Sequence, residues 1–214
     1  MSRRESALQN IPAIPTTYRG VRYRSRLEAR WASFFDALGW RVDYEPDLQA
    51  GLVIPDFLLV DFAHPVLVEC KPAVTVDELA DERAKLIARM PNWLKRDIER
   101  ELRVLELDDL APLELTDRAL DDLVRVDCGQ NPRGYSRRIL VVGPSLHLVG
   151  DAVTVDGRHG LCECRDAHGG HTGLVTELGA PCLRCGCDVE AWSLAADVFP
   201  AWRAAQNAAH WKPA

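Results

Sequence analysis

The chain has 214 residues, of which 47% are hydrophobic and 27% are charged, and its formal net charge is −6. These values are typical of a soluble globular protein of one or two domains, and the acidic balance argues against nucleic-acid binding by the whole surface. No apolar run approaches the roughly 20 residues that cross a bilayer, and no apolar segment follows the basic residues of MSRRESALQN, so we expect no membrane partner, no signal peptide and a cytoplasmic location.

Positive charge is concentrated at the start of the chain, where residues 1–40 hold seven arginines against three acidic residues. Residues 1–16 contain Pro12 and Pro15 and have no periodicity, which predicts a flexible arm. Residues 17–24 predict a short strand or hairpin. The arginines on and just after it are either a flank that faces phosphate groups or a solvated edge; they are Arg19, Arg22, Arg24 and Arg26.

The first helix is predicted over residues 25–38, because apolar residues recur there at helical spacing; they are Leu27, Trp31, Phe34, Phe35 and Leu38. Gly39 is a natural stop. Ser25 followed three residues later by Glu28 forms a capping box. Glu28 therefore either closes the helix start or reaches a pocket at the rim of the buried face, and both roles stay open.

Three strands follow, over residues 40–45, 53–60 and 65–71. Three charged residues stand on the last two strands, which are otherwise apolar; they are Asp56, Glu69 and Lys71. Side chains alternate along a strand, so Glu69 and Lys71 share a face and Cys70 takes the other. With Asp56 they could form an acidic pocket that holds a hard divalent cation beside a lysine. The alternative is that Glu69 and Lys71 form a neutralising pair on an edge strand.

The rest of the chain predicts further helices and strands. Residues 75–89 form a helix with acidic residues early and cations late, residues 91–135 an inserted helical element, and residues 138–144 a buried strand. This strand returns to the sheet and gives an α/β fold with a mixed central sheet flanked by helices. Residues 146–155 add one or two strands. Residues 190–211 predict a tail helix interrupted at Pro200, whose tryptophans either dock on the core or stack on bases.

Five of the seven cysteines lie within residues 162–187. In a reducing compartment this clustering predicts metal rather than disulfides. A structural Zn²⁺ with four ligands is expected on Cys162, Cys164, Cys182 and Cys185, with Cys187 as an alternate. His168 and His171, in a glycine-rich loop, are weaker candidates, and free thiols are the alternative. Cys70 and Cys128 read as isolated core or loop cysteines.

Four motifs together resemble the PD-(D/E)XK nuclease superfamily: RSRLEARWA at 24–32, YEP at 44–46, IPDF at 54–57 and VECKP at 68–72. The layout is similar to compact phage and actinobacterial members, to phage Holliday-junction resolvases and to the nuclease subunit of heteromeric transposases. The resemblance covers about residues 17–90 and the strand near 138–144, and it implies a restriction-endonuclease-like domain over residues 17–150 that includes the 91–135 insertion. The cysteines and the apolar pattern predict a zinc-ribbon-like module at 151–190 and a C-terminal helix at 191–214 after it.

The resemblance also implies roles for single residues. Asp56 and Glu69 would bind Mg²⁺ or Mn²⁺ together with the backbone carbonyl of Cys70. Glu28 would assist the metal or position water, and Lys71 would orient or activate the attacking water. Lys71 would act either as a protonated electrostatic clamp or, with a pKa lowered by burial, as a base.

The function expected from these residues is metal-dependent DNA endonuclease activity, with a homodimer or a partner in a recombination or mobile-element complex. The alternatives are a non-catalytic nucleic-acid-binding or assembly module with a zinc ribbon, and a zinc-ribbon interaction protein.

Overall fold

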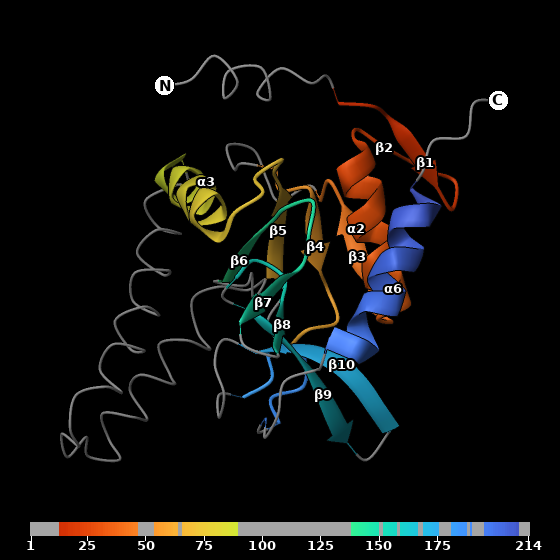
Figure 1. Cartoon of the computed structure of the whole chain (residues 1–214), viewed down its shortest axis with the longest axis vertical. Coiled ribbons are helices and arrows are strands. Elements are labelled where there is room, and N and C mark those ends of the chain that lie inside the picture. The colour runs from red at the N-terminus through yellow and green to blue at the C-terminus, as the bar shows by residue number, and fades with distance from the viewer. Residues whose placement is uncertain are drawn as a thin grey trace.

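The computed structural model describes residues 13–46, 54–63, 66–89, 138–149, 152–157, 159–166, 169–175, 181–187, 189 and 195–209. The predicted insertion at 91–135, His168, Cys128 and most of the N-terminal arm lie outside these residues. Within them the fold is mixed α/β, with helices and three sheets (Figure 1). Across the described ranges, no helix is both long and apolar enough to cross a membrane.

The first elements agree with the sequence pattern. Strands β1 (Thr16–Tyr18) and β2 (Val21–Tyr23) pair as an antiparallel hairpin, and helix α2 (Arg26–Ala37) follows with Ser25 as its N-cap. Trp31, Phe34 and Phe35 on α2 are fully buried, as their helical spacing predicts.

The central sheet has the order β3-β4-β5-β6. The first three strands are antiparallel neighbours, and the fourth runs parallel to β5, so the sheet is mixed as expected; the strands are β3 (Val42–Tyr44), β4 (Phe57–Leu59), β5 (Val66–Cys70) and β6 (Arg138–Val142). Helix α3 (Val76–Arg89) connects toward β6 and packs Leu79 and Leu86 on one face of the sheet. Helix α2 covers the other face, where Phe57 and Val68 meet its aromatic residues.

A second, antiparallel sheet has the order β10-β9-β8-β7; its strands are β7 (His147–Val149), β8 (Ala152–Thr154), β9 (Gly160–Asp166) and β10 (Gly169–Val175). Leu161 and Leu174 from this sheet join the same apolar cluster as Trp31. One core therefore connects the central sheet, the second sheet and the tail helix.

The tail helix α6 (Ala195–Ala208) lies along α2 (Figure 1). Trp202 is buried, with its ring centroid 4.7 Å from that of Trp31 and 5.1 Å from that of Phe34. This residue docks the tail on the core and is not available to stack on bases. Trp192 and Trp211 lie outside the described residues.

Two sequence predictions about the second half of the chain are wrong. The helix is not interrupted at Pro200 but continues through it, because burial of residues on both sides, Val198 and Trp202, offsets the missing backbone hydrogen bond. Residues 169–171 are not a glycine-rich loop but the start of β10, because they pair in register with β9.

Candidate functional site

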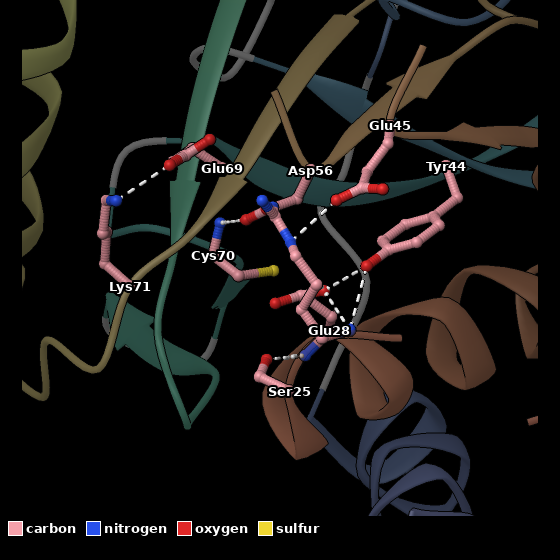
Figure 2. A network of polar contacts seen from close by, with 9 residues as sticks. Ser25, Glu28, Tyr44, Glu45, Asp56, Glu69, Cys70 and Lys71 are labelled. Atoms are coloured by element: carbon pink, nitrogen blue, oxygen red, sulfur yellow. Dashed lines mark hydrogen bonds and ion pairs between the residues drawn. The ribbon is translucent and has the colours of Figure 1, made fainter. Parts of the chain in front are cut away.

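The carboxylate of Glu28 both supports the start of α2 and reaches the edge of the central sheet (Figure 2). Ser25 Oγ accepts a hydrogen bond from the Glu28 N–H at 3.1 Å, which is the N-cap contact. Glu28 Oε2 accepts hydrogen bonds from the Arg24 N–H at 3.1 Å and from the Tyr44 hydroxyl at 2.7 Å. The reciprocal bond of the predicted capping box thus goes to Arg24 instead of Ser25. The geometry gives Glu28 a structural role and brings its buried carboxylate toward Asp56.

Asp56 stands just before β4 and is 4% exposed. The register pairs Phe57 with Val68, so Asp56 lies one step further on, across from Glu69. Its Oδ2 accepts a hydrogen bond from the Cys70 N–H at 2.7 Å. Burial, with the nearby charges of Glu69 and Glu28, raises the pKa of Asp56 to about 6, although the Cys70 N–H and Arg24 act against this. The carboxyl group of Asp56 is therefore costly to ionise unless a further cation lies beside it.

The side chains of Glu69 and Lys71 lie on the same face at the end of β5, as the alternation along a strand predicts. Lys71 Nζ lies 2.8 Å from Glu69 Oε1 (Figure 2). The second oxygen, Glu69 Oε2, is buried and has no hydrogen-bond partner in the described part of the chain. A buried carboxylate oxygen without a donor is costly, so this atom is open to a water or a cation.

Cys70 is a free cysteine that packs against the core cluster, as expected. Its backbone N–H donates to Asp56, and the negative charges of the nearby acidic residues act on its thiol. Burial, together with the charges of Asp56, Glu28 and Glu69, holds the pKa of the thiol well above its ordinary value, so Cys70 stays protonated. The Cys70 carbonyl as a metal ligand stays a prediction.

The four arginines proposed to face phosphate have different partners in the structure. Arg24 pairs with Asp56 and, through Nε, with Glu45 Oε1 at 2.8 Å, close to the start of α2. Arg19 pairs with Asp36 at 2.7 Å in the last turn of the same helix, so these two guanidinium groups bind opposite ends of α2. Arg22 is exposed, and Arg26 holds a buried Nε without a hydrogen-bond partner in the described residues.

Sequence reasoning missed the parts that Tyr44 and Glu45 play. The Tyr44 hydroxyl binds Glu28, and the Glu45 N–H donates to the Asp56 carbonyl at 3.0 Å. Glu45 has φ of 47°, a left-handed conformation that is strained for a residue with a side chain. This backbone turn aims its carboxylate at Arg24. The Tyr44-Glu45-Pro46 run was the only sequence signal, because Pro46 ends the strand there.

The donor set around Asp56 consists of carboxylate oxygens, which suits a hard cation such as Mg²⁺ or Mn²⁺. The unpartnered Glu69 Oε2 and the raised pKa of Asp56 both fit such an ion. The carboxylates are not drawn to one point, however: in the described residues the only group of three or more potential ligand atoms within 4.8 Å of one another is a cysteine and histidine cluster.

That cluster consists of Cys164, His171, Cys182 and Cys185, and it could hold a metal such as zinc. Cys164 and His171 are paired residues on β9 and β10, so their side chains share one face. Cys182 and Cys185 come from the following turn, where the Gly186 N–H donates to the Cys182 carbonyl at 2.8 Å and Gly186 has φ of 75°. His171, a weaker candidate in the sequence, therefore stands in the cluster.

The other two cysteines lie beside this cluster. Cys162 Sγ is 3.8 Å from Cys164 Sγ, and Cys187 Sγ is 3.0 Å from Cys185 Sγ. Hydrogen bonds from Cys162 first, and from the Cys185 and Arg184 N–H groups, lower the pKa of Cys182 to about 4 against the effect of burial. The lowered pKa favours the thiolate form of Cys182, which is the form that binds metal.

Gly173 makes room for this thiolate. It pairs with Cys162 on the neighbouring strand, and a Cβ built on it would lie 2.3 Å from Cys182 Sγ. No other residue type fits there unless the Cys182 sulfur or the strand shifts. The close approach of β10 to the cysteine turn therefore depends on glycine at this position.

Arg184 connects the cysteine turn to the N-terminal half of the fold. Its guanidinium donates to the Gly39 carbonyl at 2.8 Å, to Asp61 Oδ2 at 2.7 Å and to the Thr172 carbonyl at 3.0 Å. The side chains of Arg184 and Asp61 are 17% and 11% exposed, so water screens this pair little. Together with the shared core and the hydrogen bond from the Ala63 N–H to the Arg184 carbonyl, this side chain links the cysteine turn to the N-terminal half of the fold.

Replacing Arg184 with alanine should lower the free energy of unfolding by about 2–4 kcal/mol, because the mostly buried carboxylate of Asp61 loses its charged donor and the Gly39 and Thr172 carbonyls each lose a hydrogen bond. Denaturant unfolding of the metal-loaded protein measures this. The exposed Arg203 on α6 gives the control, since Arg203→Ala should change stability by less than about 0.5 kcal/mol. Equal effects of the two substitutions would show that Arg184 does not connect the two parts.

The raised pKa of Asp56 predicts how stability depends on pH. An acid whose folded pKa lies above its unfolded value stabilises the folded state when protonated, and this contribution is lost as pH rises through about 6. Wild-type protein freed of divalent cations should therefore lose about 1 kcal/mol between pH 5 and 7.5 relative to Asp56→Asn, which has no such proton to lose. Urea unfolding at both pH values measures the difference. Parallel profiles of the two proteins would mean that the Asp56 pKa is ordinary.

Comparison of the chain with protein-family models, with curated proteins and with solved structures finds no match.

Proposed function

We propose that this chain is a metal-dependent DNA endonuclease that hydrolyses phosphodiester bonds. The observation that carries the proposal is the pair of carboxylates at the paired ends of β4 and β5, Asp56 and Glu69, beside Lys71. Glu69 Oε2 is buried and lacks a donor in the described residues. The resemblance of these motifs to the PD-(D/E)XK nucleases supports the same chemistry. It also points to the same class of substrate.

Each residue of the site has a part in this chemistry. Asp56 and Glu69 would hold Mg²⁺ or Mn²⁺, with Glu28 assisting from α2. Bound there, the ion supplies Lewis-acid stabilisation of the charge that develops on the phosphodiester oxygens. Lys71, fixed by its ion pair with Glu69, would orient the attacking water and place a positive charge beside the phosphate. Tyr44 would keep the Glu28 carboxylate aimed at the sheet edge through its 2.7 Å hydrogen bond.

We assign a structural role to zinc in the cysteine and histidine cluster. Its four ligand atoms come from β9, β10 and the turn after them, so one ion would tie three segments together. Cys182 and Cys164 are buried, which leaves little room for a substrate at the ion. Sites with four protein ligands are closed and stabilise folds, whereas catalytic sites keep an open position.

A panel of DNA substrates tests the proposed activity. Duplex, forked and four-way DNA are incubated with the purified protein in Mn²⁺, in Mg²⁺ and in EDTA. The proposal predicts cleavage of at least one substrate with either metal and none in EDTA. Binding of the whole panel without cleavage of any member would contradict it.

One observation favours a second function. Arg24 pairs with Asp56 and Glu45, so the protein itself neutralises part of this group of acidic side chains. A chain that no longer cuts DNA would keep such a pairing for stability, and it would then act as a nucleic-acid-binding or assembly module with a zinc ribbon. Cation binding separates the two functions, because only the nuclease needs Mn²⁺ at Asp56.

A further inference from the structure

The Arg24 side chain bridges the acidic residues of the site. Its Nη2 binds Asp56 Oδ1, its Nε lies 2.8 Å from Glu45 Oε1, and the same Nε is 3.9 Å from Glu28 Oε2. These carboxylates come from three separate segments of the chain, before β4, after β3 and from α2. The Arg24 guanidinium thus lies among three carboxylates and partly neutralises their negative charge.

The backbone of Arg24 is held inside the site, whereas its side chain is exposed to solvent. The Arg24 N–H donates to Glu28 Oε2 at 3.1 Å and to the Tyr44 hydroxyl oxygen at 3.0 Å. The side chain is 58% exposed, whereas that of Asp56 is 5% exposed. The guanidinium can therefore leave Asp56 by rotating its own side chain into solvent, with no movement of α2 or of the sheet.

The net charge of the acidic cluster matches the charge of one divalent cation. Four carboxylates, those of Glu28, Glu45, Asp56 and Glu69, face two cationic side chains, Arg24 and Lys71. The remaining two negative charges equal the charge of one Mg²⁺ or Mn²⁺. A cation on Asp56 and the Arg24 guanidinium would also repel each other and compete for the same oxygen, Oδ1.

We propose that Arg24 is a metal-displaced phosphate ligand: it binds Asp56 in the metal-free chain, leaves when a divalent cation binds there, and then contacts the phosphate of the substrate. The displacement step needs only cation binding, and the phosphate step rests on the proposed nuclease function. This accounts for carboxylates that are not gathered at one point in the described part of the molecule. It also accounts for a single exposed arginine with three acidic partners.

The first experiment measures Mn²⁺ affinity by electron paramagnetic resonance on zinc-loaded protein of full length. Arg24→Gln removes the competitor, so Mn²⁺ should bind about tenfold more tightly than to wild type. Arg22→Gln removes the same charge from β2, where the side chain is exposed, and should change Mn²⁺ affinity by less than about twofold. Arg24→Lys keeps the charge but loses the forked donors, and should fall between Arg24→Gln and wild type.

Equal Mn²⁺ affinities of wild type and Arg24→Gln, or equal tightening by Arg24→Gln and Arg22→Gln, would overturn the displacement step. Circular dichroism of each variant confirms that it is folded. Should Arg24→Gln not fold, the comparison of Arg24→Lys with wild type decides the outcome by the same criterion.

The second experiment measures binding of a phosphorothioate DNA duplex by fluorescence anisotropy, with and without Mn²⁺. With Mn²⁺, Arg24→Gln should bind the duplex about fivefold more weakly than wild type, and without Mn²⁺ the two should bind alike. Equal binding in Mn²⁺ would overturn the phosphate step. If loss of Arg24 tightens Mn²⁺ binding but the protein never cuts DNA, the displacement step stands and the nuclease function is wrong. If the protein cuts DNA but loss of Arg24 leaves Mn²⁺ affinity unchanged, the nuclease function stands and the displacement step is wrong.

Discussion

Replacing Lys71 with methionine should slow Mn²⁺-dependent DNA cleavage by a factor of about 10²–10⁴. The ammonium of Lys71 lies 2.8 Å from Glu69 Oε1 at the end of β5, where it can hold a water or a phosphate oxygen beside the carboxylates. Methionine keeps most of the apolar stem and removes only the charge and its donors. Glu69 and Asp56 stay in place, so Mn²⁺ should still bind.

Single-turnover cleavage rates and Mn²⁺ affinity, measured on the same preparations, separate these effects. Asp56→Ala should lose both cleavage and Mn²⁺ binding, whereas Lys71→Met should lose cleavage alone. The matched control is Lys85→Met on α3, where the lysine is exposed and pairs with Glu82. Cleavage by Lys71→Met at the wild-type rate would show that Glu69 and Lys71 are only a neutralising pair.

Removal of the metal from the cysteine and histidine cluster should lower the free energy of unfolding by at least about 3–5 kcal/mol, because metal binding that needs a folded site is also folding energy. The loss spreads beyond the cluster. Leu161, Leu174 and Leu183 belong to the same core as Trp31, so loosening of β9, β10 and the cysteine turn exposes residues that support α2. Cys182→Ser should have the same effect as a strong chelator.

The ligand set can be tested directly by zinc content, measured by mass spectrometry of purified protein. His171→Ala should lose zinc, whereas Cys162→Ser should keep one zinc per chain, because the ligand atoms of Cys164, His171, Cys182 and Cys185 are the four that gather. The opposite result would restore the set of four cysteines expected from the sequence. Thermal unfolding of the two variants should follow their zinc content.

The helices and strands that carry the site could be predicted because their signals are local. The spacing of Trp31, Phe34 and Phe35 fixes one face of α2, and alternation fixes the shared face of Glu69 and Lys71. The Ser25 cap also follows from sequence alone. The apolar run at 138–144 predicts a strand that returns to a mixed sheet, and the structure adds that this strand, β6, pairs parallel with β5.

The partners of charged side chains could not be predicted in the same way. Arg24 was expected to face phosphate, but it binds Asp56, which is distant in sequence and near only because β4 pairs with β3 and β5. The role of Glu45 depends on a positive φ that no residue pattern announces. His171 enters the metal cluster because the register places it opposite Cys164, and register is a property of the whole hairpin.

The most direct test of the central claim is nicking of a supercoiled plasmid by zinc-loaded protein as Mn²⁺ is added, with Asp56→Asn prepared in parallel. The wild-type protein should convert the plasmid to open-circular or linear DNA in proportion to Mn²⁺ occupancy. Asp56→Asn should leave the plasmid supercoiled while unfolding at a denaturant concentration no lower than wild type at pH 7.5. Nicking by both proteins at the same rate, or by neither at any Mn²⁺ concentration, would contradict a nuclease site built on Asp56.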